Sequence, residues 1–267
     1  MTRSLSTVRG RRISLAIVQA VTALAVVGAA GLLGCRSAPG PAPAKLDHFL
    51  VYEVERIEAG HEVRVSDQFN LPLAPAVLEL QTHFANPTRK QHPGGSAGIV
   101  DTNHHLSWYV LREPQPRRTV RFRNQFGQHS VNTGPSAFYL VPTEKSSDPG
   151  SEFPKDLDHY RCYRVVRVNT APALPVVQVG DQFGTVAGLQ VGDPVLFCNP
   201  ARKVREGEPP VGVQNADDHL AVYSLPPEDV SQAIKVRDQF DDRELRVRRR
   251  VFLAVPTDKQ VFVTHEN

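Results

Sequence analysis

The stretch EVRVSDQF (62–69) decides the fold, because its pattern returns three more times in the same chain. The echoes are TVRFRNQF (119–126), VVQVGDQF (176–183) and AIKVRDQF (233–240). Apolar and polar residues alternate in these stretches, and β-branched and aromatic side chains are frequent, which is typical of β-strands. We therefore expect each copy to be a strand. A tight turn is expected after each Phe, because the next residue is Asn70, Gly127, Gly184 or Asp241, and these residue types tolerate positive φ.

Two further anchors accompany each echo. A His and a Tyr four residues apart precede it, and a Pro followed three residues later by a Lys comes after it. Three anchors in a fixed order, four times, indicate an internal repeat of about 55 residues. The repeated motif consists of His48, Tyr52, Asp67 and Phe69; His105, Tyr109, Asn124 and Phe126; His159, Tyr163, Asp181 and Phe183; and His219, Tyr223, Asp238 and Phe240.

The four copies also alternate between two types, which gives a longer repeat made of two copies. Copies one and three open with LDH (46–48 and 157–159) and close with NP, whereas copies two and four close with VPT, so the order is A-B-A-B. One repeat of this size buries little core, and an A repeat paired with a B repeat gives a domain of common size. The predicted organisation is a signal peptide (1–34), a Pro/Ala-rich tether (35–45), β-module 1 with repeats 1 and 2 (46–156), β-module 2 with repeats 3 and 4 (157–259), and a tail (260–267).

The predicted fold class is all-β, with three or four strands per repeat and two tandem β-barrel or sandwich modules. A four-bladed, propeller-like arrangement is the alternative, because four repeats of this size could each supply a blade. No segment after the apolar N-terminal run shows a helical apolar period over three turns, although PPEDVSQA (226–233) could form one helical turn.

The N-terminal segment indicates export. A basic stretch, MTRSLSTVRGRR (1–12), precedes an apolar run, ISLAIVQAVTALAVVGAAGLL (13–33), which is the order of a secretory signal. The run leads into LLGC (32–35), which resembles the lipobox of bacterial lipoproteins. That resemblance implies cleavage between Gly34 and Cys35 and lipidation of Cys35. An uncleaved helix that spans the bilayer is the alternative.

Both interpretations place the rest of the chain outside the cytoplasm, because the Arg cluster stays inside. We predict a lipid-anchored protein of the cell envelope that faces the periplasm or the exterior. The residue after the Cys is Arg36 rather than Asp, and the resemblance to bacterial lipoproteins, by the sorting rule of enterobacteria, then implies the outer membrane. Residues 1–34 carry four Arg and no acid, so the net charge of +3 becomes −1 without them. Such a nearly neutral chain gives no general case for nucleic-acid binding.

The repeats resemble a domain of unknown function found in secreted bacterial proteins. The shared elements are Asp-His-x-x-Cys-Tyr, Val-x-Val-x-Asp-Gln-Phe-Gly, and Leu-Cys-Asn-Pro with a nearby Lys. The third copy matches best, with LDHYRCYRV (157–165), VQVGDQFG (177–184) and VLFCNPARK (195–203). The resemblance covers about residues 46–259 and implies a recurrent all-β module with no activity to carry over. Copy one lacks both Cys, and copy two has Asn124 in place of the Asp.

The repeated His, Tyr and Asp allow two interpretations. As a metal or catalytic site, His48, Tyr52 and Asp67 of one repeat would act together, since His is a common ligand and general acid or base. As a buried polar tie, the Asp and Gln would hydrogen-bond His, Tyr or a turn backbone in every copy. Asn124, which replaces the acid in copy two, suits a hydrogen-bonding role. We therefore predict a structural motif, with no catalytic residue, no metal and no cofactor.

The two remaining cysteines, Cys162 and Cys198, both lie in copy three. Apolar residues replace both in each other copy: Val51 with Ala85, Trp108 with Leu140, and Val222 with Ala254. This paired replacement indicates that the two positions face each other across neighbouring strands. We expect a disulfide in an oxidising compartment, with two buried free thiols as the alternative.

Two Arg-rich strands, RRTVRFR (117–123) and RELRVRRRVF (243–252), are also notable, and Arg246, Arg248 and Arg250 are expected to share one face. A solvated sheet face explains this pattern, and a basic surface for an anionic glycan or lipid headgroup is the alternative.

The predicted function is a non-enzymatic, membrane-anchored extracytoplasmic lipoprotein with a structural or binding role in the cell envelope. The alternatives are a binding module for an anionic glycan or lipid headgroup, and a metal-dependent or hydrolytic enzyme that uses one repeat's His, Tyr and Asp. The expected partners are the membrane, through the lipid anchor, and an envelope glycan or another envelope protein, but no nucleic acid.

Overall fold

The computed structural model describes residues 46–148 and 150–265. The predicted signal peptide, its cleavage between Gly34 and Cys35, and the tether lie outside these residues. The described residues belong to one compact unit. Nowhere in this part of the chain is there a helix of the length and apolar character that crossing a bilayer requires.

The all-β prediction is confirmed. Twelve strands make up the secondary structure of the described residues. They are β1 (His48–Asp67), β2 (Asn70–His92), β3 (Gly95–Ala97), β4 (His105–Glu113), β5 (Arg118–Asn124), β6 (Gly127–Thr143), β7 (His159–Thr170), β8 (Val176–Asp181), β9 (Gly184–Gln190), β10 (Pro194–Val204), β11 (His219–Arg237) and β12 (Asp242–Thr264).

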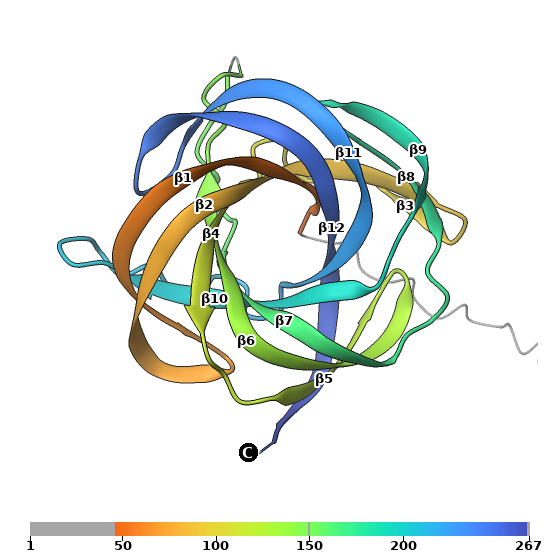
Figure 1. Ribbon diagram of the computed structural model, residues 1–267, viewed down its shortest axis with the longest axis horizontal. Coiled ribbons are helices and arrows are strands. Elements are labelled where there is room, and N and C mark those ends of the chain that lie inside the picture. The colour runs from red at the N-terminus through yellow and green to blue at the C-terminus, as the bar shows by residue number, and fades with distance from the viewer. Residues whose placement is uncertain (1–45, 149, 266–267) are drawn as a thin grey trace, which may run out of the picture. The chain divides into compact units, whose positions relative to one another are not determined.

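These strands form one large antiparallel sheet, which curves around a common centre (Figure 1). The main path of hydrogen-bonded neighbours is β1-β10-β11-β12-β5-β6-β4-β2-β8-β9. The sheet is branched rather than a simple ring, because β3 and β7 pair off this path and β1 also pairs with β12 and β2. Strands of different repeats therefore lie side by side, unlike propeller blades, which are separate sheets.

In each repeat the chain follows an outward strand, reverses direction at the Asp/Asn-Gln-Phe motif and continues along an antiparallel strand. In repeats 1 and 4 the outward strand is unbroken, as in β1, so these repeats consist of long hairpins. In repeats 2 and 3 the proline-rich segments 114–117 and 171–175 separate two shorter strands. Proline lacks the N–H that a ladder needs, which accounts for both interruptions. The number of strands per repeat consequently varies around the predicted three or four.

A tight turn is present in each copy, but the Gln-Phe pair itself forms it, two residues earlier than predicted. Asp67 pairs with Asn70, Asn124 with Gly127 and Asp181 with Gly184, so two residues form the turn in each case. The φ angles of Gly127 and Gly184 are 112° and 138°, which an L-residue rarely adopts. The expected helical turn at 226–233 is wrong, because these residues continue β11 through two register shifts.

Strands of the two predicted modules pair directly with each other. β1, from the first module, pairs with β10 and β12 of the second, and β6 pairs with β7 across the predicted boundary at residue 157. These pairings satisfy backbone groups that would otherwise form exposed sheet edges. The predicted division into β-module 1 (46–156) and β-module 2 (157–259) stays a prediction.

The first half of each outward strand is buried on both faces. In β1, Leu50 and Tyr52 belong to one apolar cluster, whereas Phe49 and Val51 belong to another, as the alternation of side chains requires. The second cluster contains all four pairs of positions that the sequence linked to the cysteines. These positions are directly opposite in register: Val51 and Ala85, Trp108 and Leu140, Cys162 and Cys198, and Val222 and Ala254.

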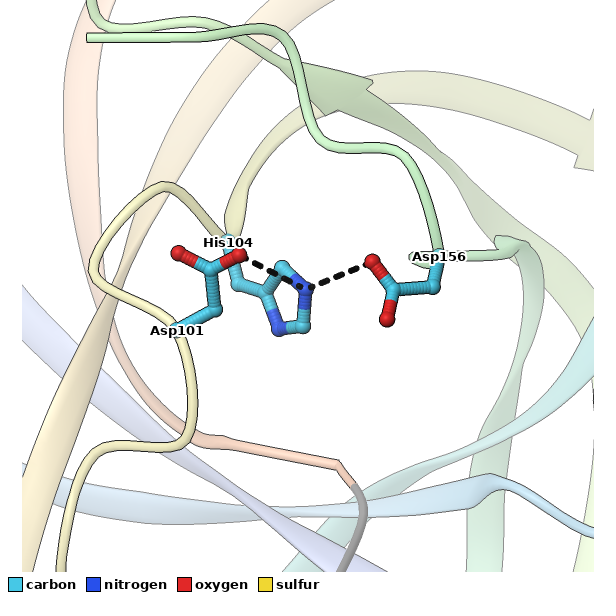
Figure 2. A group of neighbouring side chains, drawn as sticks. All are labelled: Asp101, His104 and Asp156. Carbon is cyan, nitrogen blue, oxygen red and sulfur yellow. Dashed lines mark ion pairs between the residues drawn. The ribbon is translucent and has the colours of Figure 1, made fainter.

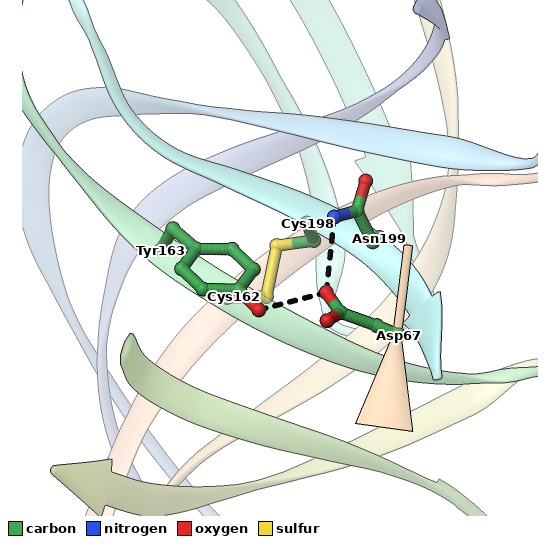
Figure 3. Close-up of a disulfide and its surroundings, with 5 residues drawn as sticks. All are labelled: Asp67, Cys162, Tyr163, Cys198 and Asn199. Atoms are coloured by element: carbon green, nitrogen blue, oxygen red, sulfur yellow. Dashed lines mark hydrogen bonds between the residues drawn. A yellow bond between two sulfur atoms is a disulfide. The ribbon is translucent and has the colours of Figure 1, made fainter. Parts of the chain in front are cut away.

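The predicted disulfide is confirmed. Cys162 on β7 and Cys198 on β10 form a bond across paired strands, close to Asp67 and Tyr163 (Figure 3). Both cysteines are fully buried. The bond therefore cross-links two strands within the cluster where the other three repeats have apolar pairs.

Candidate functional site

The Asp of each odd-numbered repeat bonds to the Tyr of the other odd-numbered repeat. The Tyr163 hydroxyl donates to Asp67 Oδ2 at 2.8 Å (Figure 3). The Tyr52 hydroxyl donates to Asp181 Oδ2 at 2.8 Å. The amide of Asn199 adds a bond of 3.0 Å to Asp67, and Asn86 does the same for Asp181. Burial, together with the neighbouring carboxylate, raises the pKa of both tyrosines, so each remains a hydrogen-bond donor.

The even-numbered repeats are tied in the same reciprocal way. The Tyr109 hydroxyl donates to Asp238 Oδ2 at 2.5 Å, and Asn124 donates from Nδ2 to the Tyr223 hydroxyl at 2.7 Å. The direction of the second bond is reversed because Asn124 is an amide. The Tyr223 hydroxyl is 3.1 Å from His129 Nε2. An amide therefore fits the tie as well as an acid does.

A side-chain oxygen that the tie does not use caps the turn of each motif residue. Asp181 Oδ1 accepts a hydrogen bond from the Phe183 amide at 2.8 Å, and Asp238 Oδ1 accepts one from the Phe240 amide at 2.8 Å. Asn124 Oδ1 plays the same part. One side chain thus fixes the turn and joins it to the opposite repeat, which explains why the tripeptide recurs.

A second set of contacts joins each repeat to the next one around the sheet. The Lys of each repeat lies over the Phe in the Asp/Asn-Gln-Phe motif of the next repeat, and the Lys of the fourth repeat lies over the Phe of the first. The distances from Nζ to the ring centre are 4.2 Å for Lys90 and Phe126, 5.2 Å for Lys145 and Phe183, 4.5 Å for Lys203 and Phe240, and 5.3 Å for Lys259 and Phe69. Burial lowers the pKa of Lys90 to about 7 and that of Lys259 to about 8.

The four repeated histidines are buried and do not join the Tyr–Asp ties. Burial lowers the pKa of His105, His159 and His219 to about 3, and that of His48 well below its ordinary value. In each case the Lys of the same repeat lowers the pKa further. All four imidazoles are thus neutral at physiological pH.

The grouping of His, Tyr and Asp from one repeat is therefore wrong. Tyr52 bonds to Asp181, not to Asp67 of its own repeat. Tyr52 and Asp67 lie on the same strand, β1, where residues advance about 3.3 Å each, so they are separated by about 50 Å along the strand path. The turn can reach only a Tyr that another repeat supplies.

A surface cavity of about 270 Å³ lies elsewhere on the sheet, and we call it the arginine cavity. Its lining combines apolar side chains with exposed arginines. The lining residues are Glu53, Val54, Arg56, Leu80, Thr82, His83, Val110, Arg112, Ala137, Phe138, Arg164 and Arg249. Burial lowers the pKa of His83 to about 4, so its ring adds no positive charge.

The charges in this cavity are only partly balanced. Arg249 Nε is 2.6 Å from Glu53 Oε2, and Arg112 is 3.3 Å from Glu79. Arg56 and Arg164 form no ion pair with any residue that the structure describes. Two exposed guanidinium groups therefore have their donors available beside an apolar surface.

The three arginines predicted to share one face of the Arg-rich strand in repeat 4 are not all exposed. Arg246 and Arg248 are exposed, whereas Arg250 is buried and bonds to Glu228 at 2.5 Å. The register between β1 and β12 shifts between Val247 and Arg249, and this shift breaks the alternation. Sequence reasoning missed Arg56 and Arg164, because they lie on different strands, β1 and β7, far apart in the chain.

The fold and the reciprocal ties define the class of the molecule, an all-β protein built from internal repeats. Residues 105–256 match a family described as a repeat of unknown function, DUF7450, and this match spans more than half of the chain. The chain belongs to that family. A search of the curated proteins and a search of the solved structures each found no match to this chain.

Proposed function

We propose that this protein is a non-enzymatic, lipid-anchored extracytoplasmic protein with a structural or binding role in the cell envelope. The observation that carries the proposal is the use of the repeated motif, whose Tyr and Asp or Asn side chains bond to one another between repeats. The motif therefore braces the sheet instead of supplying reactive groups. The lipobox-like LLGC (32–35) supplies the expected anchor.

The disulfide supports the same location. Cys162 and Cys198 form a bond, and protein disulfides persist mainly in exported proteins, where the environment is oxidising.

Replacing Cys35 with Ser tests the anchor. We expect the wild-type protein to incorporate labelled palmitate and to fractionate with membranes, and the variant to do neither, because Ser lacks the thiol that is acylated. Cys162→Ser in the same strain serves as the control and should keep the label. Equal labelling of the Cys35→Ser variant and the wild type would contradict lipidation at this residue.

A second candidate function, binding of an anionic group, is favoured by the arginine cavity. Guanidinium groups bind carboxylate and phosphate through paired N–H donors, and the neighbouring apolar wall suits the carbon framework of a sugar or a lipid headgroup. Arg56 and Arg164 are the two residues that would contribute most, since no carboxylate in the described chain neutralises them.

The double substitution Arg56→Ala/Arg164→Ala is expected to weaken binding of an anionic probe at least about tenfold, since a hydrogen bond to a charged group contributes about 1.5–3 kcal/mol. Titration with a uronic-acid oligosaccharide and with vesicles of an anionic phospholipid separates glycan from lipid. The matched control is Arg121→Ala/Arg123→Ala, which removes the same charge from exposed positions on β5. Equal weakening by both pairs would show that only net charge matters.

A further inference from the structure

Three side chains with metal-binding atoms converge at one end of the sheet. Asp101 and His104 lie in the loop between β3 and β4, and Asp156 lies in the segment between β6 and β7 (Figure 2). His104 Nε2 is 3.8 Å from Asp101 Oδ2 and 3.8 Å from Asp156 Oδ1. The three candidate ligand atoms all lie within 4.8 Å of one another.

The imidazole of His104 is fixed and directed into this group. The residue is only 3% exposed, and its Nδ1 lies 3.0 Å from Asp47 Oδ2. Asp47 is itself held by the backbone amides of Val100 at 2.6 Å and Asp101 at 3.0 Å. A carboxylate on one ring nitrogen orients the other nitrogen toward a metal in many protein sites.

His104 Nε2 is a buried atom with no hydrogen-bond partner among the described residues. This atom lies between two carboxylates, so a cation bound there would have all three groups as neighbours. The separation of 3.8 Å is too long for a hydrogen bond from a protonated ring. It is close to the spacing of about 3.4 Å between ligands that bind one tetrahedral Zn²⁺ at about 2.1 Å.

Both carboxylates have the freedom that such a site needs. Asp101 uses Oδ1 to accept a bond of 2.8 Å from the Asn103 amide, which leaves Oδ2 for another partner. The Asp156 side chain is 75% exposed and can move by the few tenths of an ångström required. Lys155, its neighbour, is paired with Glu152 at 2.9 Å.

The fold contains a loop with the same backbone and without these ligands. Asp158, the counterpart of Asp47, accepts bonds of 2.8 Å from the amides of Gln214 and Asn215. Asn215 and Asp218 stand where the first loop has Asp101 and His104, and the amide-to-carbonyl bonds of the turn are the same. The backbone therefore does not require an imidazole here, so the His104 cluster is an addition to the shared loop.

We propose that Asp101, His104 and Asp156 bind one divalent transition-metal ion, for which Zn²⁺ is the appropriate probe. One imidazole nitrogen and two carboxylate oxygens suit Zn²⁺ or Mn²⁺ better than Ca²⁺, which prefers six to eight oxygens. Three protein ligands leave at least one position for water. The bound ion would join the loop before β4 to the segment before β7.

The test is Zn²⁺ binding to the metal-stripped full chain in detergent, followed by equilibrium dialysis and elemental analysis. We expect about one Zn²⁺ per chain above any background, with Asp156→Asn weakening the affinity at least tenfold. Asp156 is exposed, so this variant should fold normally, which the thermal unfolding midpoint without metal verifies. Asp217→Asn, an exposed acid of the counterpart loop, is the matched control and should bind as the wild type does.

A second measurement, the absorption spectrum of bound Co²⁺, tests another of the proposed ligands, Asp101. Co²⁺ in place of Zn²⁺ should give visible absorption bands whose position changes in Asp101→Asn. The proposal is overturned if Asp156→Asn and Asp101→Asn both keep the wild-type affinity, if the wild-type chain binds no Zn²⁺ at micromolar concentration, or if Ca²⁺ displaces Zn²⁺ at equal concentration.

Discussion

Replacing Asp67 with Ala is expected to lower the free energy of unfolding by about 2–4 kcal/mol, because it leaves two buried donors without an acceptor. Those donors are the Tyr163 hydroxyl and the Asn199 amide, and the turn also loses the bond from the Asn70 amide. Asp67 is 5% exposed, so water cannot readily replace the lost acceptor. Urea unfolding followed by circular dichroism measures the change.

Asp67→Asn is the matched comparison and should cost clearly less than Asp67→Ala. Asn keeps an oxygen for the turn, and Asn124 shows that an amide can occupy this position in repeat 2. A double-mutant cycle with Tyr163→Phe isolates the tie itself, and a coupling energy near zero would contradict the role assigned to it.

Removal of the disulfide is the second large effect. The double variant Cys162→Val/Cys198→Ala should be less stable than the oxidised wild type by about 3–4 kcal/mol, the loop-closure contribution expected for 37 residues. The chosen residues copy Val222 and Ala254, which face each other at the same positions of repeat 4. Packing is thus largely preserved, and the loss reports mainly the missing cross-link.

Reductant provides the control for this prediction. Dithiothreitol should lower the unfolding midpoint of the wild type and leave that of the variant unchanged. The contribution assigned to the cross-link would be wrong if the wild type unfolded at the same urea concentration in its oxidised and reduced forms.

The amino-acid sequence alone determined the local structure. Alternation predicted that the first echo is a strand, and its residues Val63 and Val65 lie on β1, buried in the same apolar cluster. Paired replacement placed Cys162 opposite Cys198, because apolar substitutes change together only when two positions share one space. These inferences succeed because strand periodicity and turn chemistry depend on residues that are close in sequence or repeated at a fixed interval.

Only the tertiary structure decided which copies meet. Four nearly identical motifs offer the same donors and acceptors, so nothing in the letters distinguishes a bond between Tyr52 and Asp67 from one between Tyr52 and Asp181. The arginine cavity and the His104 cluster could likewise not be predicted from the sequence. Arg56 and Arg164 lie far apart in the chain, and so do His104 and Asp156. The path of a curved sheet brings such residues together, and local periodicity carries no information about that path.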